Sequence, residues 1–144
     1  MKYAVSSCLL GENCKYSGGN NKNEELLAFL ADKEVISICP EVLGGLPTPR
    51  ACAEIQGERV VNTEGRDVSE AFRKGAEEAI RIIREFGADL VITQPRSPSC
   101  GKGIIYDGSF TGTLIKGNGI FVQLLEQSGI TVKTCEEFLK GEHK

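Results

Sequence analysis

Three cysteines occur at the same kind of place in the sequence, shortly after a run of apolar and β-branched residues. These are Cys8, Cys39 and Cys100. Such runs are typical of buried strands, and open α/β sheets bind ligands beyond the carboxyl ends of their parallel strands. If the three strands are parallel neighbours, the sequence predicts that the three thiols meet at one edge of a sheet.

Thiolates are soft ligands that suit zinc, copper(I) and iron–sulfur clusters, and ligands on separate loops can converge on such a group. The chain has six cysteines but no pair spaced Cys-x-x-Cys, which disfavours a zinc ribbon or a thioredoxin-type pair. Cysteines also serve as small buried hydrophobic residues, the role expected of Cys135, and Cys52 is expected to be incidental. Cys14 is open to three interpretations: a fourth ligand, a resolving thiol or a packing residue of its loop.

Glu41 follows Cys39 by two residues. In an extended loop, the two side chains would point the same way, which makes Glu41 a candidate general base beside the thiols. The alternative is a structural carboxylate that caps loop amides or pairs with Arg50.

Ser97 and Ser99 flank Pro98 just before Cys100, and hydroxyl groups in such loops most often bond to turn backbone. The only histidine, His143, lies at the tail, so a Ser/His or Cys/His hydrolase is not expected. The glycine motifs of dinucleotide and phosphate loops do not occur, which argues against a dinucleotide-dependent dehydrogenase.

The chain of 144 residues suits one domain over residues 1–144. With 17 basic and 20 acidic residues, its net charge is −3, so neither a nucleic acid duplex nor an anionic membrane is an expected partner. A small substrate is expected instead. The apolar stretch at residues 4–10 is too short to span a membrane and lacks the layout of a signal peptide, so we expect a cytoplasmic protein.

Hydrophobic periodicity predicts strands and helices in alternation, with a small hairpin excursion at residues 54–67. The loop that starts at Pro40 is expected to lack regular structure. A second hairpin is predicted at 104–114, with its turn at 106–109 because Asp-Gly suits a tight turn. Capping boxes are predicted at Asp67 with Glu70 and at Thr134 with Glu137, and Asn118 is expected to cap a helix. The expected strands are 2–7, 35–38, 89–93 and 130–133, and the expected helices are 23–31, 68–86, 118–127 and 136–140.

The fold class that follows is α/β: a single Rossmann-like domain with a mostly parallel sheet flanked by helices.

Three motifs in this order resemble a bacterial family known as domain of unknown function 523 (DUF523), whose characterised members are 2-thiouracil desulfurases. The resemblance spans nearly the whole chain. The matching residues are Ser7, Cys8, Leu9, Leu10 and Gly11 with Cys14, Lys15, Tyr16 and Gly18; Cys39, Pro40 and Glu41 with Gly44 to Arg50 and Glu54; and Ser97, Pro98, Ser99, Cys100 and Gly101.

The resemblance implies a Rossmann-like domain that holds a [4Fe-4S] cluster by Cys8, Cys39 and Cys100 and leaves the fourth iron without a protein ligand. The family's catalytic acid and serine match Glu41 and Ser97, with Ser99 competing for the serine match. One departure is visible after Arg50, where the family often has prolines and this chain has Ala51 and Cys52.

The resemblance therefore implies a non-redox desulfurase that acts on a small thiolated heterocycle such as a thiolated pyrimidine. In this interpretation Glu41 activates water, Ser97 positions the water or relays a proton, and Arg50 or Lys15 is a candidate to orient the heterocycle. Two alternatives remain. One is a cluster-bearing sulfur carrier or redox sensor without turnover, and the other is a zinc or thiol-redox site.

Overall fold

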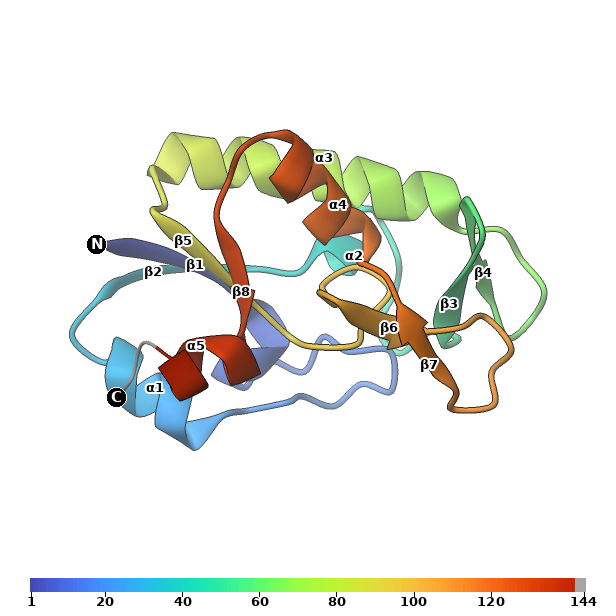
Figure 1. Ribbon diagram of the computed structural model, residues 1–144, viewed down its shortest axis with the longest axis horizontal. Helices are drawn as coiled ribbons and strands as arrows, with labels where there is room; N and C mark the ends of the chain where they lie inside the picture. The colour runs from blue at the N-terminus through green and yellow to red at the C-terminus, as the bar shows by residue number, and fades with distance from the viewer. Residues whose placement is uncertain (142–144) are drawn as a thin grey trace.

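A four-stranded parallel sheet forms the centre of the molecule (Figure 1). A computed structural model of the chain describes residues 1–141, so His143 lies outside the described residues. The strand order is β2-β1-β5-β8, and every neighbouring pair is parallel. These strands are β1 (Lys2–Ser6), β2 (Glu34–Ile38), β5 (Leu90–Thr93) and β8 (Val132–Thr134). The predicted α/β class is confirmed.

Helices cover both faces of the sheet (Figure 1). α3 (Ser69–Phe86) and α4 (Ile120–Gln127) pack on one face. On the other face lie α1 (Glu24–Leu30) and α5 (Cys135–Gly141). No helix within residues 1–141 is long and apolar enough to cross a membrane.

Two antiparallel hairpins are separate from the central sheet. Both contribute to an apolar cluster with α3 and α4. The first, β3 (Ala53–Gln56) with β4 (Arg59–Asn62), confirms the predicted excursion. The second joins β6 (Ile104–Tyr106) to β7 (Leu114–Lys116) through residues 107–113, so the tight turn predicted at 106–109 is wrong. The buried Glu54 carboxylate accepts hydrogen bonds from two amides of that longer loop, which draws it toward β3.

The segment after β2 also differs from the prediction, because it contains a one-turn helix, α2 (Pro40–Leu43), where an irregular loop was expected. Proline suits the first position of a helix, where its missing N–H has no helical partner. Cys39 is the residue before this turn and Glu41 lies within it. The two residues therefore do not share the extended strand geometry that the sequence suggested.

Two predicted helix starts are wrong and one is confirmed. α3 begins at Ser69 after Val68, which provides no side-chain cap, in place of the capping box predicted from Asp67. α4 begins after Gly119, because the Asn118 side chain instead accepts a hydrogen bond from the Gly103 amide. The capping box of Thr134 and Glu137 is present in both directions.

Glycines allow α2 to press its backbone directly against α3. A methyl group at Gly75 of α3 would overlap the carbonyl oxygen of Pro40, and one at Gly44 would overlap that of Ala71. No side chain could be accommodated at either position without moving a backbone. This backbone contact fixes the position of α2, and with it Glu41, relative to α3.

We expect Gly75→Ala to destabilise the fold by about 1–3 kcal/mol, the usual cost of overpacking a rigid contact. Alanine favours the helix itself by about 1 kcal/mol, so the clash must exceed that gain. Urea denaturation measures the difference. The matched control is Gly141→Ala in α5, where an added methyl group meets nothing within 4 Å. Equal stability of Gly75→Ala and wild type would contradict the packing argument.

Candidate functional site

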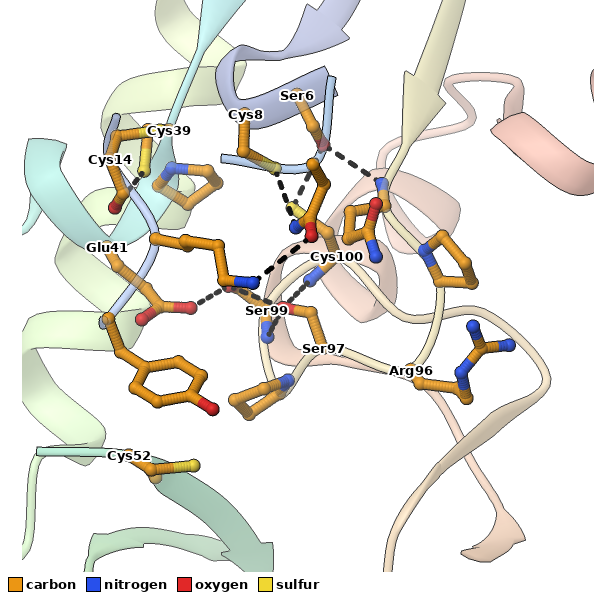
Figure 2. A pocket seen from close by; sticks show the side chains of 18 of the residues that line it. Ser6, Cys8, Cys14, Cys39, Glu41, Cys52, Arg96, Ser97, Ser99 and Cys100 are labelled. Atoms are coloured by element: carbon orange, nitrogen blue, oxygen red, sulfur yellow. Dashed lines mark hydrogen bonds between the residues drawn. The ribbon is translucent and has the colours of Figure 1, made fainter. Parts of the chain in front are cut away.

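The three cysteines predicted to converge all line one cavity of about 490 Å³ at the carboxyl edge of the sheet (Figure 2). Cys8 lies in a 3₁₀ helix, η1 (Ser7–Leu10), that follows β1. Cys39 directly follows β2, and Cys100 lies beyond β5. The chain adds β2 on one side of β1 and β5 on the other. Cys8 and Cys100 therefore flank the point where strand order reverses, the usual ligand site of such sheets.

The remaining lining comes from the loops after β1, β2 and β5 and from the two hairpins. The volume of the cavity lies in the range of small-molecule sites. Cys52, expected to be incidental, also borders the cavity. The polar and aromatic members of the lining besides the three thiols include Cys14, Lys15, Tyr16, Asn21, Glu41, Cys52, Glu54, Gln94, Arg96, Ser97, Ser99 and Tyr106.

The thiols differ in how readily they ionise. Burial raises the pKa of Cys8 and of the almost fully enclosed Cys100. The neighbouring Cys14 side chain lowers the pKa of Cys39 to about 7, and the Cys39 side chain raises the pKa of Cys14 in turn. The Cys39 thiol donates to the Cys14 carbonyl oxygen at 3.9 Å. The lowered pKa of Cys39 favours its thiolate form relative to Cys8 and Cys100.

The Glu41 carboxylate is held from two sides. Arg50 Nε donates to one carboxylate oxygen at 3.0 Å, and Ser99 Oγ donates to the other at 2.7 Å. The rest of the Arg50 guanidinium donates to the carbonyl oxygens of Cys14 and Pro47 and to the hydroxyl of Thr48. The Arg50 side chain is 7% exposed. These contacts tie it to Glu41 and to two loops, which leaves it little freedom to orient a ligand.

The two candidate serines form a chain of hydrogen bonds that ends on Glu41. Ser99 Oγ has one proton, and that proton points at the carboxylate. Ser97 Oγ, 3.2 Å from Ser99 Oγ, must then be the donor between the two hydroxyls. Ser97 Oγ also accepts the amides of Ser99 and Cys100. Ser99 is buried, so it lies between Glu41 and the more accessible Ser97.

The kind and placement of the ligands bear on which metal group the site could hold. Within residues 1–141, no three Cys, His, Asp or Glu side chains are close enough to hold one metal ion. The ligands of a single zinc ion must all approach it to about 2–2.3 Å, whereas an iron–sulfur cluster is bonded at separate corners. All six cysteines are free of disulfides. Three free thiols line this cavity, and cysteine thiolates are the ligands that iron–sulfur clusters use.

Comparison with known proteins adds a family. A sequence model of the 2-thiouracil desulfurase family matches residues 4–137. The chain belongs to the 2-thiouracil desulfurase family. This desulfurase chain is also 39% identical, over 138 aligned residues, to the uncharacterised protein YbbK of Bacillus subtilis strain 168, an alignment that covers 89% of this chain and 91% of that protein. A solved structure of a [4Fe-4S]-dependent thiouracil desulfidase, TudS, has 40% sequence identity and a TM-score of 0.90, with 96% of this chain and 93% of that chain covered.

Two residues of this desulfurase family member were not identified from the sequence. Ser6 donates a hydrogen bond to the Cys100 sulfur, and Asn21 donates one to the Cys8 sulfur. Ser6 had a weak signal, since it is polar within an apolar run and precedes Cys8 by two residues. Asn21 lies in a cluster of asparagines, and composition does not distinguish it from its neighbours.

Proposed function

We propose that this chain is a [4Fe-4S]-dependent, non-redox desulfurase that removes sulfur from a small thiolated pyrimidine such as 2-thiouracil. The observation that carries the proposal is that three thiols from three strand ends and the Glu41 carboxylate border the same cavity. Family membership supports it, as does the similarity to a thiouracil desulfidase along almost the whole chain.

In this proposal Cys8, Cys39 and Cys100 hold the cluster. When bound there, the cluster would supply a Lewis acid for the thiocarbonyl sulfur, which would make the adjacent carbon more electrophilic. Cys14 is not a ligand in this proposal, and its carbonyl oxygen accepts a hydrogen bond from the Cys39 thiol.

Glu41 is proposed as the general base. Arg50 and Ser99 fix both carboxylate oxygens, and each oxygen keeps a lone pair. With one of these, the carboxylate can take a proton from a water molecule as that water attacks the thiocarbonyl carbon. Because Glu41 is already oriented, little reorganisation accompanies the step.

The serine chain is proposed to return a proton to the cavity. Once Glu41 is protonated, it can donate to Ser99, Ser99 can donate to Ser97, and Ser97 can donate to the departing sulfur. This gives Ser97 contact with the substrate, while Ser99 relays. The overall reaction converts a thiocarbonyl compound and water into the carbonyl compound and hydrogen sulfide, so no electrons are gained or lost.

Anaerobic reconstitution followed by a substrate assay tests the proposal. We expect about four iron and four acid-labile sulfide per chain, and release of uracil and sulfide from 2-thiouracil in equal amounts. Absence of iron and sulfide would overturn the proposal, and stoichiometric zinc would favour a zinc or thiol site. A fully loaded protein that releases no sulfide from any thiolated pyrimidine would favour the sulfur-carrier or sensor alternative.

We also propose that the protein acts in the cytoplasm as one domain over residues 1–144. Free thiols that line a cavity suit a reducing compartment. The two hairpins share apolar contacts with α3 and α4, which makes them part of the same packed unit.

A further inference from the structure

The Ser6 hydroxyl points its proton at a sulfur atom. Ser6 is 2% exposed and ends β1, and its Oγ lies 3.3 Å from Cys100 Sγ. The backbone amide of Gln94 donates to the same Oγ at 3.2 Å. The oxygen lone pair therefore faces Gln94, and the single hydroxyl proton is left for the sulfur.

Asn21 presents an amide N–H to a second sulfur. Its Nδ2 lies 3.5 Å from Cys8 Sγ. The other side of the amide accepts from Lys15 Nζ at 3.3 Å, and a lysine ammonium is only a donor. This contact fixes the amide so that its nitrogen, not its oxygen, faces Cys8. The Asn21 backbone amide also donates to the Cys8 carbonyl, which holds the loop in place.

We propose that Ser6 and Asn21 are positioning residues that stabilise negative charge on Cys100 and Cys8 and thereby set the reduction potential of the cluster. This inference rests on the proposed function. Hydrogen bonds to ligand sulfurs withdraw electron density and raise the potential of iron–sulfur clusters. The same withdrawal makes an open iron a stronger Lewis acid. Within residues 1–141, no side-chain amide or hydroxyl donates to the Cys39 sulfur, and the Cys39 thiol donates to the Cys14 carbonyl oxygen at 3.9 Å.

A redox titration of the reconstituted protein, followed by electron paramagnetic resonance, tests the inference. We expect Ser6→Ala and Asn21→Ala to keep the cluster and to shift its potential to more negative values. The larger shift is expected for Ser6→Ala, because its hydrogen bond is shorter and more deeply buried.

Each variant has a matched control. Thr93→Val removes a buried hydroxyl at the end of β5 that has no hydrogen-bond partner among residues 1–141. Asn20→Ala removes an amide, in the same loop as Asn21, that bonds to Asn13 and not to sulfur. Both controls are expected to keep the wild-type potential.

The outcomes separate this inference from the proposed function. A wild-type cluster whose potential is unchanged by Ser6→Ala and Asn21→Ala overturns the inference alone, whereas a wild-type chain that takes up no cluster overturns both. If Ser6→Ala fails to fold or to take up a cluster, the shift measured for Asn21→Ala decides.

Discussion

Replacement of Cys8, Cys39 or Cys100 by serine is expected to abolish cluster binding. The three thiols are the only ligands that the proposal provides, and a serine hydroxyl is a poor, hard ligand for iron. Iron and acid-labile sulfide should fall from about four per chain to near zero after anaerobic reconstitution, together with the visible absorption. Desulfurase activity should be lost in parallel.

The other cysteines serve as controls for this expectation. Cys135→Ser changes a buried residue at the start of α5, in the apolar cluster between the sheet and helices α1 and α5. This variant should keep the full iron content. Cys14→Ser should also keep it. If Cys14→Ser loses the cluster while Cys8→Ser keeps it, the proposed ligand set is wrong.

Glu41→Gln is expected to keep the cluster and to lower turnover of 2-thiouracil by about 10²–10⁴-fold, the usual contribution of a general base. Glutamine has the same shape and can still accept from Arg50 or Ser99, but it cannot take a proton from water. Iron content, absorption spectrum and unfolding midpoint should stay near those of the wild type. The change should therefore appear in the chemical step.

Glu70→Gln is the control for the loss of one carboxylate. Glu70 lies in the first turn of α3, as Glu41 lies in the first turn of α2, but it is exposed to solvent. Its replacement should leave turnover unchanged. Wild-type turnover in Glu41→Gln would show that Glu41 is not the general base, and Ser97 and Ser99 would be the next groups to test.

The strands could be predicted from the sequence because apolar, β-branched runs such as Leu90–Thr93 leave few alternatives. The convergence of the three cysteines followed from strand ends and parallel pairing. The α2 turn could not be predicted in the same way, since a single helical turn has no periodicity. It depends on a backbone contact with Gly75, more than thirty residues further along the chain.

The site was predictable by residue type more than by arrangement. A pairing of Glu41 with Arg50 was considered, because the two lie in one segment. The bond from Ser99 to Glu41 joins residues 58 positions apart, and no local pattern indicates which of two serines makes it. The 107–113 loop was missed for the same reason, since the carboxylate that holds it belongs to another hairpin.

The origin of the three thiols in three separate strand ends has a consequence for biosynthesis. During translation, Cys8 and Cys39 leave the ribosome with β1 and β2, well before β5 and Cys100 have been made. A nascent chain at that stage has only two of the three thiols, and β1 has no partner on its second side. A group that requires all three can be inserted only after β5 has joined the sheet. Delivery of a cofactor to the proposed site must therefore follow the synthesis of at least the first 100 of the 144 residues.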